Sequence, residues 1–134
     1  MARTYSVFIS HSWAHVDDLR ALRDLLEKRG YFHVEFEESS PDKPINSENP
    51  EYIKRRLREK ISNSDIVLGI PGMYASRSDW MKWELDTAMA EGIPIVGVIP
   101  WGQERVSSVV KLRAIECVGW NTESIVKAIR KHAK

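Results

Sequence analysis

Residues 64–85 read SDIVLGIPGMYASRSDWMKWEL, and this stretch decides the fold class. The apolar run over 65–70 predicts a strand buried on both faces, as strands of parallel sheets commonly are. Pro71 and Gly72 end that strand. A helix is expected to follow over about 79–91. The segment therefore predicts a strand that leads into a helix, which is the repeating unit of α/β proteins.

The same alternation of strands and helices continues on both sides of this segment. Strands are expected over residues 5–10, 33–36, 93–99 and 113–118. Helices are expected where apolar residues recur at helical spacing, namely at Val16, Leu19, Leu22 and Leu26, at Ile53, Leu57 and Ile61, and at Ile125, Val126 and Ile129. We expect a long irregular loop from Glu37 to Pro50, and a loop with a short helix over 101–112.

Small polar residues mark the expected starts of two helices. Ser78 or Asp79 is expected to cap the helix that carries Trp80. Asn121 or Thr122 is expected to cap the last helix. The oxygens of these side chains can accept hydrogen bonds from the backbone N–H groups that a first helical turn leaves unsatisfied.

Five strand-and-helix units predict one α/β domain that spans residues 1–134. We expect a flavodoxin-like fold of three layers, whose five-stranded parallel sheet has the order 2-1-3-4-5. In this order the direction of travel reverses between the first and third strands, so a crevice opens at their carboxyl ends. Residues 10–14 and 71–78 border that crevice, where we expect any ligand to bind.

The composition argues against several classes of partner. The chain has 20 Lys and Arg against 19 Asp and Glu, a net charge of +1, so it has no general attraction for nucleic acid or membranes. No apolar run approaches the roughly 18 residues of a membrane span, and we recognise no secretory signal. Cys117 is the one cysteine, so we expect no internal disulfide and a cytoplasmic location.

Common cofactor and catalytic motifs are absent from the sequence. G-x-G-x-x-G does not follow the first strand, and the P-loop, H-E-x-x-H and G-x-S-x-G motifs do not occur. The four histidines and Cys117 do not together make up a zinc-binding motif, so we expect no metal site and no bound cofactor. A response-regulator receiver would need acidic residues after the first strand and an aspartate after the third, where this chain has His11-Ser12 and Pro71-Gly72.

A carboxylate and an aromatic ring are expected on one face of the helix that begins beside the crevice. Trp80 and Glu84 are four residues apart, which places them one turn apart on the same face. The simpler interpretation of Glu84 is a solvated surface carboxylate. The simpler interpretation of Trp80 and Trp83 is core packing.

Three stretches in this order resemble Toll/interleukin-1 receptor (TIR) domains. Residues 5–12, YSVFISHS, resemble the opening box of that family, and residues 93–100, IPIVGVIP, resemble its fourth strand. The pattern Trp80-x-x-x-Glu84-Leu85 resembles the region after its third strand. The Pro-rich loop after the second strand and residues 61–67, ISNSDIV, look closest to the stand-alone bacterial TIR-like proteins of Thoeris antiphage systems.

This resemblance implies an activity and a catalytic residue. Many bacterial members of the family cleave NAD with the glutamate of the Trp-x-x-x-Glu motif, which is Glu84 here. In such systems the product, a derivative of ADP-ribose, signals to a separate effector protein. TIR domains also self-associate, so we expect weak activity in dilute solution, with the loop from Glu37 to Pro50 long enough to reach a neighbouring subunit.

The chemistry of NAD cleavage agrees with one carboxylate. Nicotinamide leaves as a neutral molecule, so no general acid is needed, and the transition state resembles the oxocarbenium ion of glycoside cleavage. Glu84 is expected to stabilise that positive charge, with Trp80 stacked on nicotinamide or excluding water. The residues expected to contact substrate lie around the crevice and are Ser10, His11, Ser12, Trp13, Tyr74 and Trp80.

Two other functions stay open at this point. A TIR domain that only binds other TIR domains would be a scaffold without turnover. A nucleoside deoxyribosyltransferase-like enzyme would share the fold and would use a helix-borne glutamate to attack the sugar. The intact pair of Trp80 and Glu84 favours an enzyme over a scaffold.

Overall fold

A computed structural model describes residues 3–12, 16–36, 50–72, 75–100 and 108–134. Strands and helices alternate along these residues, as expected from the sequence. The elements are β1 (Tyr5–His11), α1 (Val16–Arg29), β2 (Phe32–Phe36), α2 (Pro50–Ser62), β3 (Ile66–Ile70), α3 (Ala75–Ala90), β4 (Ile95–Ile99), α4 (Ser108–Lys111), β5 (Glu116–Gly119) and α5 (Thr122–His132).

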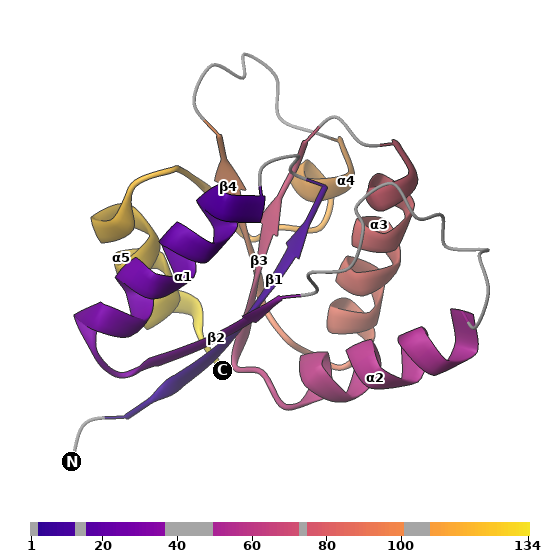
Figure 1. The fold of residues 1–134 in the computed structure, drawn as a ribbon, viewed down its shortest axis with the longest axis horizontal. Coiled ribbons are helices and arrows are strands. Elements are labelled where there is room, and N and C mark those ends of the chain that lie inside the picture. The colour runs from indigo at the N-terminus through magenta and orange to yellow at the C-terminus, as the bar shows by residue number, and fades with distance from the viewer. Residues whose placement is uncertain (1–2, 13–15, 37–49, 73–74, 101–107) are drawn as a thin grey trace.

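The five strands form one parallel sheet with the order β2-β1-β3-β4-β5 (Figure 1). β1 is an inner strand, and Val7 lies opposite Val34 of β2 on one side and Ile66 of β3 on the other. The predicted flavodoxin-like fold and strand order are confirmed. All strands therefore end at the same edge of the sheet, and the chain reverses its direction of travel between β1 and β3.

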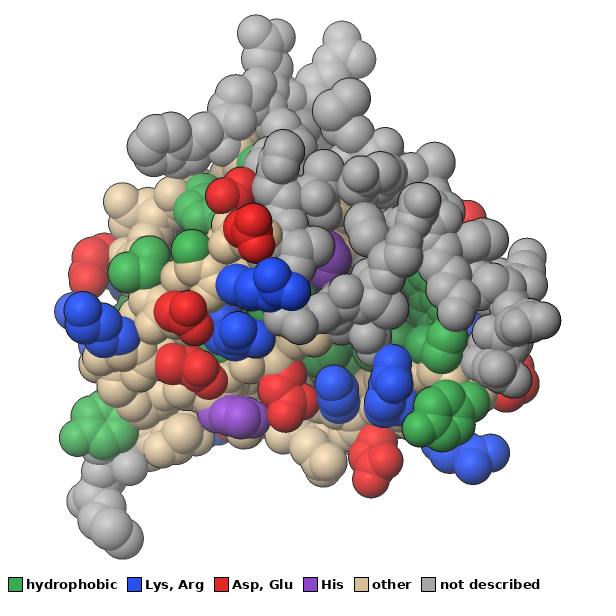
Figure 2. Space-filling model, in the orientation of Figure 1, with side chains coloured by type: hydrophobic (Ala, Val, Ile, Leu, Met, Phe, Trp, Pro, Cys, Tyr) green, Lys and Arg blue, Asp and Glu red, His purple; other side chains and the backbone are tan. Residues whose placement is uncertain are grey.

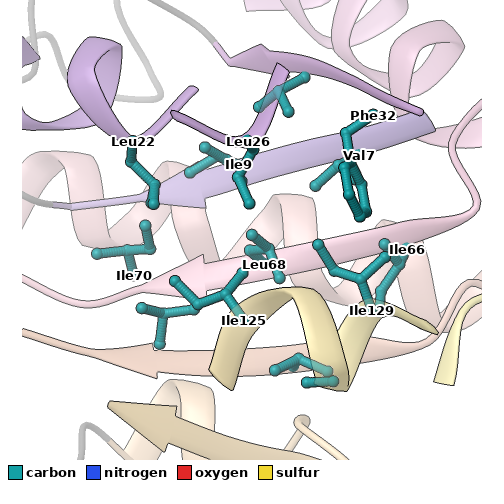
Figure 3. Packing of buried hydrophobic residues seen from close by; sticks show 14 of the residues in the cluster. Val7, Ile9, Leu22, Leu26, Phe32, Ile66, Leu68, Ile70, Ile125 and Ile129 are labelled. Atoms are coloured by element: carbon teal, nitrogen blue, oxygen red, sulfur yellow. The ribbon is translucent and has the colours of Figure 1, made fainter. Parts of the chain in front are cut away.

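Two helical layers cover the two faces of the sheet. α1 and α5 pack on one face over an apolar cluster that includes Ile9, Leu26 and Ile129 (Figure 3). α2, α3 and α4 supply side chains to a second cluster on the other face, where Phe8 of β1 is buried. Neighbouring residues of β1 point to opposite faces because side chains alternate along a strand.

The third helix begins earlier than the sequence pattern indicates. α3 starts at Ala75 rather than near Asp79, so the expectation that Ser78 or Asp79 caps it is wrong. In the sequence the apolar period of this helix begins only at Trp80, so the pattern gives no signal for the preceding turn. The early start places the first residue of α3 five positions after Ile70, the last residue of β3.

Other boundaries move by a few residues. Pro50, expected in the loop, is the first residue of α2, where proline is well tolerated because the first N–H groups of a helix have no helical partner. The rest of the expected loop, residues 37–49, lies outside the described residues. β5 begins at Glu116 instead of Arg113, because the Ala114 N–H donates to Val110 O (2.8 Å) and closes the turn after α4.

The last helix begins as predicted. Asn121 is its N-cap, and its side-chain oxygen accepts a hydrogen bond from the Ser124 N–H at 3.0 Å. Ile125, Val126 and Ile129 are buried on the sheet side, also as predicted. A local capping signal and a local apolar period therefore agree with the tertiary packing here.

The surface carries charges of both signs. Figure 2 shows acidic and basic side chains intermingled over α1, in agreement with the net charge of +1 of the whole chain. Within the described ranges, no helix combines the length and the apolar character that crossing a membrane requires.

Candidate functional site

The end of β1 directs two serines and one histidine to opposite faces of the sheet. Ser10 and Ser12 point toward α3, where their hydroxyls lie near Glu84 and Met81. The ring of His11 instead contacts Phe36 edge-on at a centroid distance of 5.9 Å. Phe36 belongs to the cluster under α1 and α5, so the His11 ring lies on the opposite face from Glu84.

Glu84 is fully buried and is hydrogen-bonded to the sheet. Ser10 Oγ lies 2.8 Å from Glu84 Oε1, a distance typical of a hydroxyl that donates to a carboxylate. The same hydroxyl lies 3.4 Å from the carbonyl oxygen of Met81, one turn earlier on α3. These contacts join Ser10 to residues 71 and 74 positions later in the sequence.

The surroundings of Glu84 on α3 are apolar. Trp80, Met81 and Leu85 are all buried members of the cluster on this face. Burying a carboxylate costs free energy unless hydrogen bonds and nearby charges compensate. A residue whose role was packing alone would therefore destabilise the fold less if it were apolar. Buried ionisable groups near the end of a strand are candidates for a functional site.

Trp80 is buried in the core rather than exposed at the surface of a cleft. Its side chain is only 4% exposed, and its ring meets that of Trp83 edge-on at 6.1 Å. Trp83 is partly buried, and the cationic groups of Lys54 and Arg58 lie over its ring at 5.8 and 5.6 Å. Part of the basic face of α2 is therefore packed against α3 by cation–π contacts.

Ser12 links the ends of the two central strands. Its N–H donates to Ile70 O at 3.0 Å, and its hydroxyl oxygen accepts a hydrogen bond from the Gly72 N–H at 2.7 Å. The hydroxyl also lies 3.9 Å from the sulfur of Met81. The ends of β1 and β3 and the side chain of Met81 on α3 thus meet at the place where the sequence predicts the crevice.

The structure brings together four of the seven residues predicted for the site. Ser10, Ser12, Trp80 and Glu84 lie at the contact between β1 and α3. His11 is separated from them by the sheet, and Trp13 and Tyr74 lie outside the described residues. The sequence interpretation did not include Met81, although its position three residues before Glu84 places it on the same helix face.

Two residues of β5 have shifted pKa values, away from this site. A hydrogen bond from His132 lowers the pKa of the Glu116 carboxyl below its ordinary value of 4.5. Burial raises the pKa of the Cys117 thiol. No three His, Cys, Asp or Glu side chains gather at metal-binding distance in the portion of the chain that the structure covers.

A polar hollow of about 370 Å³ lies near the opposite end of β1. Its walls include Ser6, His33, Glu35, Arg56 and Lys60. Ser6 is four residues before Ser10, which is roughly 13 Å along an extended strand. The charged side chains that line this hollow have both signs, so they do not indicate one class of ligand.

The family comparison matches most of the chain. The model of the family described as "Thoeris protein ThsB, TIR-like domain" matches residues 8–105. This range contains Ser10, Ser12, Trp80 and Glu84. A comparison with curated proteins finds no significant match.

Several solved structures share the fold at low sequence identity. A 2-deoxyribosyltransferase from Bacillus psychrosaccharolyticus has 16% identity and a TM-score of 0.64, covering 90% of this chain and 89% of that one. The CMP N-glycosidase of Clostridium botulinum has 15% identity and a TM-score of 0.61, covering 93% and 98%. A 3-dehydroquinate dehydratase-like protein from Bifidobacterium longum has 16% identity and a TM-score of 0.52, covering 98% and 95%. These likenesses show a shared fold alone.

Proposed function

The chain belongs to the TIR-like family of Thoeris ThsB proteins, and from this premise we propose that it cleaves the bond between nicotinamide and ribose in NAD. Glu84 is the proposed catalytic residue. The observation that carries the proposal is the fully buried Glu84 carboxylate, hydrogen-bonded to Ser10 near the carboxyl end of β1. A carboxylate in this position is costly for stability and useful for stabilising a cation.

One carboxylate is enough for the proposed reaction. The bond from ribose C1′ to the nicotinamide nitrogen breaks, and its electron pair leaves with the neutral base. The ribose ring then carries an oxocarbenium-like positive charge, which an ionised Glu84 stabilises electrostatically. A hydroxyl of water or of the nucleotide itself completes the reaction at C1′ and loses its proton, which gives a linear or a cyclic derivative of ADP-ribose.

Substrate must reach a carboxylate that has no exposed surface. Local opening between the end of β1 and the start of α3 would bring the ribose to Glu84. Trp80, one turn earlier on α3, would then wall the ribose off from water, and Ser12 would lie beside the entering nucleotide. Water exclusion strengthens the attraction between the carboxylate and the developing cation.

The proposed product acts on other molecules. An ADP-ribose derivative released by this protein would signal to a separate effector protein in antiphage defence. Self-association belongs to the same proposal, because a neighbouring subunit would complete the site. Specific activity should then rise with protein concentration in a nicotinamide-release assay, and a constant specific activity over a hundredfold range would contradict assembly-dependent turnover.

Replacement of Glu84 by Gln tests the catalytic proposal. The change keeps the size of the side chain and deletes its charge, so nicotinamide release should fall about a hundredfold or more. Glu91→Gln is the matched control, since Glu91 is exposed just after α3 and should leave the rate unchanged. NAD cleavage by Glu84→Gln at the parent rate would favour a scaffold without turnover.

A second candidate is transfer or hydrolysis at another nucleoside. It is favoured by the fold shared with the 2-deoxyribosyltransferase and the CMP N-glycosidase. A carboxylate at Glu84 would suit a sugar cation of either origin. A base-exchange assay with deoxynucleosides and a hydrolysis assay with CMP, beside nicotinamide release, separate the two candidates.

A further inference from the structure

We propose that Ser10 is a positioning residue that keeps Glu84 ionised and oriented, rather than a contact for substrate. This inference rests on the proposed function only for its effect on catalysis. Both side chains are fully buried, and the 2.8 Å contact between Ser10 Oγ and Glu84 Oε1 ties the α3 carboxylate to β1. A hydroxyl whose one proton is already used in this way cannot also donate to a phosphate or a ribose.

The hydroxyl of Ser10 has one proton and two acceptors within reach. Glu84 Oε1 lies at 2.8 Å and Met81 O at 3.4 Å, so the hydroxyl proton is donated to Glu84. An ionised carboxylate only accepts hydrogen bonds, which fits this arrangement. If Glu84 bound a proton, its own O–H could donate to Ser10 Oγ, and the serine proton would turn to Met81 O.

The two arrangements differ in strength. With Glu84 ionised, the contact is a charge-assisted hydrogen bond, which is roughly twice as strong as a neutral one. With Glu84 protonated, two neutral contacts replace it, one of them the longer contact to Met81 O. Ser10 therefore favours the charged form of Glu84, the form that can stabilise a sugar cation.

Among the residues that the structure describes, several charges on the other elements packed on α3 have contacts of their own. β3 and β4 carry no ionisable side chain, and His11 of β1 contacts Phe36 on the other face of the sheet. On the helical side, Lys54 and Arg58 of α2 lie over the Trp83 ring, and Arg113 after α4 pairs with Asp86 at 2.6 Å. Over residues 79–90 of α3, the exposed charges are Asp79, Lys82 and Asp86. Ser10 approaches Glu84 from the sheet side, apart from these charges.

The decisive experiment follows the charge of Glu84 without using turnover. The side-chain carboxyl carbons of glutamate are labelled with ¹³C, and the Glu84 signal is assigned by its loss in Glu84→Gln. In Ser10→Ala the midpoint at which this signal titrates should move up by about one pH unit, the size expected for loss of one charge-assisted hydrogen bond. Ser64→Ala is the matched control, because Ser64 is also buried and donates to Lys60 O at 2.7 Å, yet lies before β3 at the opposite end of the sheet.

Turnover provides a second measurement on the same proteins. Ser10→Ala should lower kcat for nicotinamide release about tenfold or more while KM changes less than about twofold. The acidic limb of its rate profile should move to higher pH together with the ¹³C signal. Ser10→Thr, which keeps the hydroxyl, should titrate like the parent.

The outcomes separate this inference from the proposed function. An unmoved ¹³C titration in folded Ser10→Ala, or a change in KM alone, would overturn the positioning role. A moved titration in a protein that releases no nicotinamide would support the role of Ser10 and reject NAD cleavage. A moved titration with a lower kcat supports both.

Discussion

The two faces of the sheet bury different kinds of side chain. Under α1 and α5 the buried cluster is apolar throughout, and the His11 ring at the end of β1 contacts its Phe36. Under α2 and α3 the apolar cluster surrounds Glu84, with Ser10 and Ser12 on the strand opposite. Both faces are packed by the same alternation along the strands, so the difference lies in side-chain chemistry and not in architecture.

This contrast indicates that one face mainly stabilises the fold, while the other holds the candidate catalytic carboxylate. Apolar burial stabilises a domain in proportion to the area removed from water. The cluster under α1 and α5 contributes this stabilisation without the free-energy cost of burying a charged group. The face under α2 and α3 accepts a buried carboxylate, which reduces its net contribution to stability. Mutations on the two faces should therefore affect different measurements.

The largest expected effect is on the apolar face. Leu26→Ala removes a fully buried side chain of α1 and should lower the free energy of unfolding by about 2–5 kcal/mol, because the cavity cannot fully collapse. Leu25→Ala is its control, since the neighbouring Leu25 is 52% exposed. Urea unfolding of both variants measures the difference, and equal losses of stability would contradict the assignment of Leu26 to the apolar core.

Glu84→Gln should show the reverse pattern. The loss of a buried charge removes a desolvation cost, so the free energy of unfolding should stay within about 1 kcal/mol of the parent or rise. The same variant should lose most nicotinamide release. If urea unfolding shows a loss of stability as large as that of Leu26→Ala, Glu84 has a structural role and the contrast between the faces is weaker than described.

The smallest expected effect comes from an ion pair at the rim of the sheet. Glu116 of β5 and His132 of α5 pair at 2.5 Å, with side chains 37% and 19% exposed, and this contact lowers the pKa of Glu116. A carboxyl whose pKa is lower in the folded state adds stability above its unfolded value, and that stability is lost as pH falls through the folded value.

Comparison of the parent with His132→Asn tests this rim contact. The variant should be slightly less stable near neutral pH, and the difference should shrink as the pH falls below about 4.3, the usual range of a glutamate. Urea unfolding at several pH values measures it. A difference that grows in acid would contradict the sign derived from the Glu116 pKa.

Local patterns in the sequence determined most of the architecture. The apolar runs at 65–70 and 93–99 predicted two strands, which the structure places at Ile66–Ile70 and Ile95–Ile99. The spacing of Leu19, Leu22 and Leu26 predicted the core face of α1. These signals are readable because alternation in strands and the helical period are properties of neighbouring residues. Residues 75–78 show no apolar period, and the predicted start of α3 near residue 79 was wrong there.

The motif that pairs Trp80 with Glu84 could also be read from the sequence, but not what surrounds it. Glu84 is buried rather than solvated, and Ser10 is its hydrogen-bond donor from a strand 74 residues earlier. The alternation of β1 could have separated His11 from Ser10 and Ser12, yet it could not have named their partners. Those depend on the register of β1 against β3 and on how α3 packs across both, and such long-range contacts are decided only by the folded core as a whole.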